Sequence, residues 1–244
     1  MEYLLPGENE SFCTCKSKQF IPKVMFLATV ARPWFDMAGN VLFDEKIGIF
    51  PFIFQEPTKR NNKNQAEGTL VTKPILSITQ DVIRPCILEK EIPTIKEKWP
   101  SCSRMSTIYI QQDNARPHID PLDDKFLAVA QGDGFDIRST YQPPNSHDFN
   151  VLDLGYFRAI QSLQYREAPK TIDELVLAGT KSFEKLSPST LNRIFLTFQE
   201  CMIEVMKSKG RNNCKIPHMK KTIYKKKVVF QLLYHVIMDF CGKW

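Results

Sequence analysis

Two aspartates, Asp113 and Asp153, stand where a folded chain can present a carboxylate. Asp113 directly follows the run Ile-Tyr-Ile-Gln-Gln, which is typical of a β-strand. Asp153 comes three residues after Asn150, in a pattern typical of the first turn of a helix. Mg²⁺ prefers hard oxygen ligands and takes one or two carboxylates from protein, so the pair is a candidate metal site. On this hypothesis the carboxylates lie roughly 4–6 Å apart, within bridging distance of one ion.

Each of these residues also has a purely structural interpretation. Asp113 begins Asp-Asn-Ala-Arg-Pro, which is good turn chemistry. Asp153 complements the helix dipole in a first turn. His118 is compatible with a structural loop histidine and Asp148 with a residue that stabilises its loop, so neither residue type alone indicates a ligand.

The elements that would position the two aspartates alternate between strand and helix patterns. Pro51 marks the second strand as an edge or bulged strand, and Pro85 and Pro93 would kink or divide the first helical segment. Thr171 and Glu174 form a capping box, and Ser187 is the N-cap of the last helix. Strands are predicted at residues 21–30, 47–54, 107–112 and 136–141, and helices within 72–99, 122–131 and 151–165 and from 171 and 187 onward.

The positive charge of the chain is concentrated near its C-terminus. The net charge is +6, but residues 205–227 hold nine Lys or Arg and no acid, which leaves −3 on the rest. Such a segment can contact phosphates, act as a nuclear localisation signal, or remain a solvated surface. The candidate nucleic-acid contacts are Lys207, Lys209, Arg211, Lys215, Lys220 and Lys221.

Composition and local patterns argue against several other classes. The chain is 43% hydrophobic and 25% charged, as in ordinary globular proteins. Seven scattered cysteines form no zinc pattern and suggest reduced thiols. The first residues have no basic segment followed by a long apolar run, so no signal peptide is expected, and residues 228–240 are too short and too polar to span a membrane.

Several motifs together resemble mariner-like DNA transposases, particularly the plant-type branch. Residues 111–118 resemble the second catalytic block of that family, and residues 142–154 resemble the third. The 39 residues between Asp113 and Asp153 match the plant-type spacing. Further matches fall at residues 23–27, 46–49, 191–195 and 215–219, so the likeness covers roughly residues 3 to 220.

This resemblance implies an RNase H-like core in which three carboxylates bind Mg²⁺ or Mn²⁺ and cut and join DNA at transposon ends. Asp113 matches the second carboxylate and Asp153 the third. The first belongs to an Asp-Glu-Lys-Trp-like block on a central strand, and that block normally precedes the stretch that here is Tyr-Leu-Leu-Pro at residues 3–6. The expected fold is therefore α/β, an RNase H-like mixed sheet that lacks its first strand, with a helical C-terminal half. The expected divisions are an irregular segment at 1–19, the core at 20–210 and a basic, divergent tail at 211–244.

The departures from the family shape the functional expectation. Without the first aspartate the chain is expected to be inactive; Asp36, Asp44 and Glu45 flank a turn and have no reason to point at Asp113. His147 stands where the family usually has Pro. The end of the tail, residues 222–244, follows no family pattern and could come from a frameshift, a mis-predicted exon or a fused neighbour.

The partners and location follow from the same resemblance. DNA is the expected partner, the nucleus the expected location, a homodimer is allowed, and no membrane is expected. The region that recognises transposon ends has no counterpart in the sequence, so sequence-specific binding is not expected. The alternatives are a non-catalytic module that binds nucleic acid or protein, and a relic that does not fold. Residues 228–240 are expected to form a helix with little tertiary burial, so that deleting the tail leaves thermal stability nearly unchanged.

Overall fold

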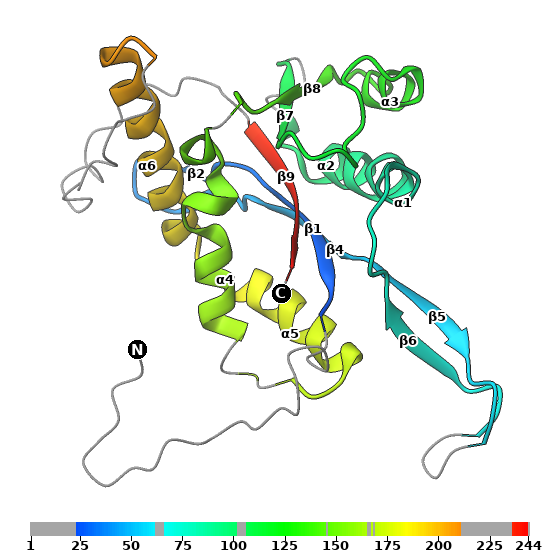
Figure 1. The fold of residues 1–244 in the computed structure, drawn as a ribbon. Helices are drawn as coiled ribbons and strands as arrows, with labels where there is room; N and C mark the ends of the chain where they lie inside the picture. The colour runs from blue at the N-terminus through cyan, green and yellow to red at the C-terminus, as the bar shows by residue number, and fades with distance from the viewer. Residues whose placement is uncertain are drawn as a thin grey trace, which may run out of the picture.

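A computed structural model describes residues 23–61, 66–101, 106–144, 146–164, 167 and 169–210, and the backbone of residues 236–243. Its centre is a five-stranded mixed sheet in the order β4-β1-β9-β7-β8 (Figure 1). β1 runs antiparallel to both β4 and β9, whereas β7 runs parallel to both β9 and β8. The bounds are β1 Met25–Val30, β4 Lys46–Pro51, β7 Ile108–Gln112, β8 Ile137–Tyr141 and β9 Val236–Lys243. The predicted α/β class is confirmed.

The central strand of the sheet comes from the C-terminal segment. β9 lies between β1 and β7, pairing Leu27 with Cys241 on one side and Gln111 with Met238 on the other (Figure 1). The prediction of a poorly packed helix at residues 228–240 is therefore wrong over the part that the structure describes. β1 and β7 would each expose a row of backbone donors and acceptors, and a segment rich in β-branched and aromatic residues satisfies both rows.

Four helical elements cover one face of the sheet. Three are consecutive, namely α1 Gln80–Cys86, the π-helical turn η2 Ile87–Glu91 and α2 Ile92–Lys98, and the fourth, α3 Asp124–Ala130, follows β7. The predicted division at the prolines is not seen: Pro85 lies inside α1 and Pro93 at the start of α2, and the junctions with the π-helical turn between them keep helical backbone angles. The core on this α1–α3 face includes Leu27, Ile47, Ile83, Ile92, Ile95, Ile108, Ile110, Phe126 and Ile137.

The other face packs against the helices that follow β8. Alternate residues of β1, Ala28 and Val30, point into this second cluster. The capping box of Thr171 and Glu174 opens α5, and the Ser187 hydroxyl accepts a hydrogen bond from the Thr190 N–H at the start of α6, as predicted. The elements are η5 Leu152–Tyr156, α4 Phe157–Gln164, α5 Ile172–Lys185 and α6 Pro188–Lys207. We call this the α4–α6 face.

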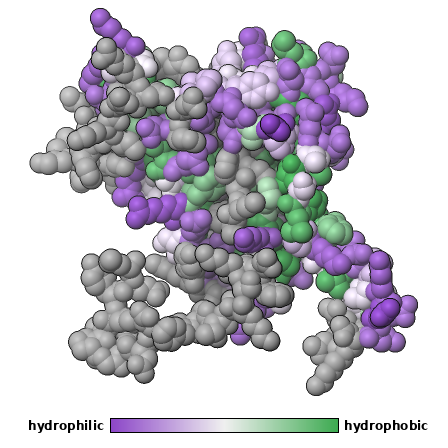
Figure 2. Space-filling view, in the orientation of Figure 1, coloured by the Kyte–Doolittle hydropathy of each residue, from purple (hydrophilic) through white to green (hydrophobic). Residues whose placement is uncertain are grey.

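Two hairpins extend from the strands β1 and β4. The smaller pairs β2 (Trp34–Phe35) with β3 (Val41–Phe43), and the larger pairs β5 (Ile53–Pro57) with β6 (Leu70–Pro74). The larger hairpin projects from the body as an arm (Figure 1), and apolar side chains gather where it leaves the body (Figure 2). Pro51 ends β4, which is an edge strand as predicted. Large apolar side chains are exposed on and beside the hairpins: Met37, Val41, Leu42, Phe54, Leu70 and Leu76.

Candidate functional site

Asp113 lies at the carboxyl end of β7, in a tight turn. Its Oδ1 accepts a hydrogen bond from the Ala115 N–H at 2.8 Å and contacts His118 Nε2 at 2.7 Å. The Asp113 side chain is 19% exposed and the His118 side chain 2%. The predicted strand end is confirmed, and the turn interpretation is also correct, because Asp113 itself bonds the backbone two residues on.

The environment of Asp113 favours its ionised form. Burial by itself raises the pKa of the carboxyl group, but the hydrogen bonds from His118 and Ala115 outweigh it. The pKa of Asp113 therefore lies below its usual range. The Oδ2 atom accepts no hydrogen bond from the residues that the structure describes, so one oxygen is held and the other is left for a ligand.

A side chain of β7 ties Asp113 to the segment that carries Asp153. Gln111 Nε2 donates a 2.6 Å hydrogen bond to the Phe149 carbonyl oxygen, in the short 3-10 helix just before η5. Ile110 and Gln112, its neighbours in β7, point to the α1–α3 face, so Gln111 points to the other face. The loop to Asp153 therefore approaches β7 on the α4–α6 face.

The start of the helix that carries Asp153 is capped by Asn150 as predicted, but the predicted helix at 151–165 is interrupted at Gly155, whose backbone angles (φ 170°, ψ −13°) are not helical. The Asn150 side chain accepts a 2.9 Å hydrogen bond from the Leu152 N–H. Asp153 lies in the first turn of η5 at an exposed position, between the buried Leu152 and the half-buried Leu154. This position suits the helix-dipole role of Asp153, because a carboxylate in the first turn complements the helix dipole. It is also compatible with a metal-ligand role, because the position is exposed.

The loop between β8 and η5 is pinned to the end of β7 by two further hydrogen bonds, and a third lies within the loop. The Gln142 N–H donates to the Gln112 carbonyl oxygen at 2.8 Å, and Asn114 Nδ2 donates to the Gln142 carbonyl oxygen at 2.9 Å. Gln142 Nε2 then donates to the Ser146 carbonyl oxygen at 2.7 Å. The amide-rich motifs thus join two segments that lie far apart in the sequence.

The acids that flank the β2–β3 hairpin have roles of their own. Asp36 bonds the backbone and side chain of Asn40, and Asp44 pairs with Lys46 at 3.4 Å. Glu45 is fully buried. None of the three contacts Asp113 or Asp153 in the described residues.

Asp239 is the acid that the sequence analysis overlooked. On β9 it pairs in register with Thr29 of β1 and Gln112 of β7, next to the Asp113 turn. Gln112 Nε2 bonds the Ile119 carbonyl oxygen, and Thr29 bonds Glu91, so both partners direct their side chains to the α1–α3 face. The only signal in the sequence was a strand-like apolar run around the acid.

Asp113 lies at the end of β7, and Asp153 lies in the segment that Gln111 ties to this strand, so the two carboxylates could serve at most one hydrated divalent ion. Mg²⁺ commonly keeps several waters while using one or two protein carboxylates. Within the described residues, no three His, Cys, Asp or Glu side chains gather as a metal site.

The basic segment falls mostly outside the described residues. Lys207, in the last turn of α6, pairs with Glu204 at 2.7 Å, and Lys209 follows in an exposed turn with a φ of 54°. Arg211, Lys215, Lys220 and Lys221 lie outside the described part, so their proposed phosphate contacts stay predictions.

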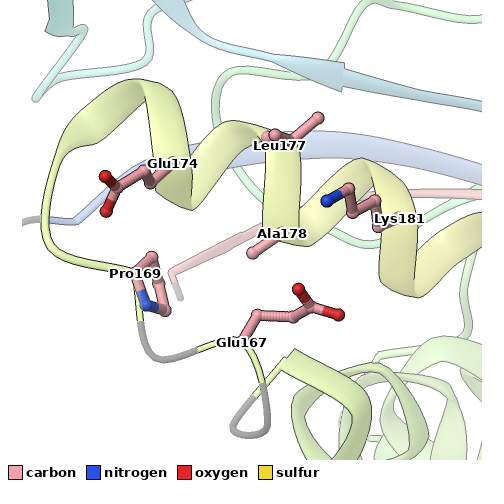
Figure 3. A pocket seen from close by; sticks show the side chains of 6 residues that line it. All are labelled: Glu167, Pro169, Glu174, Leu177, Ala178 and Lys181. Carbon is pink, nitrogen blue, oxygen red and sulfur yellow. The ribbon is translucent and has the colours of Figure 1, made fainter.

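A shallow pocket on α5 is a poor candidate for a binding site (Figure 3). Both carboxylates around it already have partners, since Glu167 pairs with Lys185 at 2.8 Å and Glu174 accepts from the Lys170 and Thr171 N–H groups. Its lining is Glu167, Pro169, Glu174, Leu177, Ala178 and Lys181. None of these residues belongs to the Asp113 or Asp153 segments.

The comparisons with known proteins give no relative. No family model, no curated protein and no solved structure matches the chain. No helix in the described part is long and apolar enough to cross a membrane.

Proposed function

We propose that this chain is a domain derived from a mariner-like transposase, which binds DNA through its phosphates and does not cut it. The 2.6 Å hydrogen bond from Gln111 to the Phe149 carbonyl oxygen carries the proposal. It joins the end of the strand before Asp113 to the segment that leads into Asp153, as a shared site requires.

The sheet order supports an RNase H-like fold for this proposal. The fold implied by the resemblance has its first strand at the centre of the sheet, and β9 occupies the centre here. Family-like motifs overlap β1, β4 and α6, elements that flank or support the central region.

In the proposed site, Asp113 and Asp153 would hold Mg²⁺ or Mn²⁺. A single ion there would place positive charge against a DNA phosphate, whereas activation of water or a DNA 3′-hydroxyl for cleavage would need a second, well-held ion. Asp113 contributes its ionised Oδ2, while its Oδ1 is fixed by His118 and Ala115. Asp153 contributes a carboxylate from an exposed helix start.

The absence of strand cleavage follows from the number and placement of acids. With two carboxylates, the second ion of a two-metal clamp is poorly held. Only Asp113 and Asp153 are counted as ligands here, and the loop to Asp153 lies on the α4–α6 face, where Gln111 bonds Phe149.

A second candidate function is a protein-interaction module. The exposed apolar side chains Phe54, Leu70 and Leu76 on and beside the projecting arm favour it. Sedimentation analysis of the purified chain separates the two, because the DNA-binding proposal does not require self-association.

Salt-dependent DNA binding tests the proposed function. We expect the chain to bind two unrelated labelled duplexes equally, with affinity that falls steeply as salt rises, because phosphate contacts release counterions and carry no base information. The double variant Lys207→Gln/Lys209→Gln should lower the slope of log affinity against log salt by roughly 1.8. A matched control, Lys90→Gln/Lys125→Gln, removes two exposed charges on the α1–α3 face and should leave the slope unchanged. Equal effects of both variants, or strong preference for one duplex, would contradict the proposal.

A further inference from the structure

Within the part of the chain that the structure describes, the buried imidazole of His118 makes a single polar contact. Its Nε2 lies 2.7 Å from Asp113 Oδ1, so the ring proton on Nε2 is donated to the carboxylate. The Nδ1 atom is buried and meets no hydrogen-bond partner among the described residues. The one directional interaction of this side chain is therefore its contact with Asp113.

The backbone of His118 is held firmly from two sides. Its N–H donates to the Ala115 carbonyl oxygen at 3.2 Å, and its carbonyl oxygen accepts from Gln80 Nε2 at 3.4 Å. Gln80 begins α1, and Ile119 belongs to the α1–α3 core. The imidazole is thus anchored to the body of the domain rather than to the turn alone.

Asp113 is less buried than the histidine that holds it. Two donors, Nε2 of His118 and the Ala115 N–H, converge on the same oxygen, Oδ1. A carboxylate held at one oxygen by two donors cannot rotate freely, so its other oxygen, Oδ2, points in a fixed direction. Groups that orient a ligand in this way commonly contribute 10- to 100-fold to metal affinity.

We propose that His118 is a positioning residue that fixes the Asp113 carboxylate so that Oδ2 is presented to a divalent cation. The inference rests on the proposed metal site, and it adds the residue that orients the first ligand. It differs from a purely structural role, in which His118 would only fill space behind the turn. A structural role would show in folding stability, whereas a positioning role shows in cation affinity.

Substitutions by the two side-chain amides separate these roles. The amide nitrogen of Gln takes the place of imidazole Nε2 and reaches Asp113, while that of Asn takes the place of Nδ1 and does not. Both bury a polar amide at the same position, so they form a matched pair even if His118→Ala fails to fold. Asp113→Asn removes the ligand itself, and Asp133→Asn, an exposed acid paired with Lys96, is the control for loss of one negative charge.

The measurement is Mn²⁺ binding to the full chain, followed by electron paramagnetic resonance of the free ion, with thermal melting of every variant. We expect His118→Asn to weaken Mn²⁺ binding by about 10- to 100-fold and His118→Gln by about threefold or less. Asp113→Asn should abolish the site and Asp133→Asn should leave it intact. If the parent binds Mn²⁺ and His118→Asn binds equally well, the positioning role is overturned and the metal site stands. If the parent binds no Mn²⁺, or Asp113→Asn does not reduce binding, both the site and the role of His118 are overturned.

Discussion

Gln112 of β7 and Asp239 of β9 are register partners at the centre of the sheet. Asp239 also pairs with Thr29 of β1, so this residue of the C-terminal segment lies between a strand from the first half of the domain, β1, and a strand from the second half, β7. β1 leads to the β4 edge and the hairpins, whereas β7 carries the Asp113 turn. β9 is thus the element through which the two halves share one sheet.

Removal of β9 should cost most of the stability of the domain. Deleting residues 236–244 leaves β1 and β7 with unpaired edges, so we expect loss of the cooperative thermal transition and aggregation on heating. A finer test is Met238→Pro, which removes a backbone N–H and should lower the melting temperature by several degrees or more. Met238→Thr retains the N–H and strand propensity and is the control. Circular dichroism melts that coincide for parent and Met238→Pro would show that β9 does not stabilise the fold.

The stability of the protein should fall as the pH rises from about 4.5 to about 7. Burial raises the pKa of Glu91, against the hydrogen bond from Thr29, and also raises the pKa of Glu45, each to about 7. Both carboxyl groups are fully buried. Each folded-state pKa exceeds the unfolded value, so the stabilisation from the protonated carboxyl groups is complete below about pH 4.5. It is lost as the pH rises through about 7, and above that the stability no longer changes with the titration of these groups.

Replacing Glu91 isolates its share of this pH dependence. Glu91→Gln keeps an oxygen that accepts from the Thr29 hydroxyl but cannot ionise. The change in unfolding free energy that the substitution causes should therefore be more favourable at pH 8 than at pH 4.5, by a few kcal/mol. Urea unfolding at both pH values measures this difference. Glu89→Gln, two residues away and exposed, should show no such difference. A parent stability that rises between pH 5 and pH 8, with Glu91→Gln unchanged, would contradict the assignment.

Tyr156 carries a buried hydroxyl without a partner in the described residues. A buried, unsatisfied hydroxyl costs about 1–3 kcal/mol, so Tyr156→Phe should leave stability unchanged or raise it by up to that amount. Tyr156→Leu removes ring volume from the α4–α6 core and should destabilise the protein by about 1–3 kcal/mol. Chemical unfolding of the three proteins measures both effects, and a clear loss of stability in Tyr156→Phe would reveal a hydrogen bond to that hydroxyl.

The parts of the fold set by local chemistry could be predicted from the sequence. The β7 strand that ends at Asp113, the Asn150 and Thr171 caps and the Ser187 start of α6 each depend on residues within a few positions. The joining of the two aspartate segments followed from a resemblance, and its physical cause, the Gln111 contact with Phe149, spans 38 residues and has no local signal.

The place of β9 was not predictable in the same way. Residues 236–243 form a short apolar run that suits a helix or a strand, and the choice is made by two open strand edges more than a hundred residues away. Asp239 was overlooked for that reason. The pairing of His118 with Asp113 was also missed, because only the folded turn shows that the imidazole is buried and aimed at the carboxylate.

The most direct test of the account is a plasmid-nicking assay on the full chain with Mn²⁺. We expect weak, salt-sensitive binding to the plasmid and no nicking above the background shared by Asp113→Ala and Asp153→Ala, because two carboxylates hold the second ion of a two-metal clamp poorly. Nicking by the parent that both variants abolish would contradict the account, and its loss in Asp239→Asn would then identify the strand β9 acid as the third ligand.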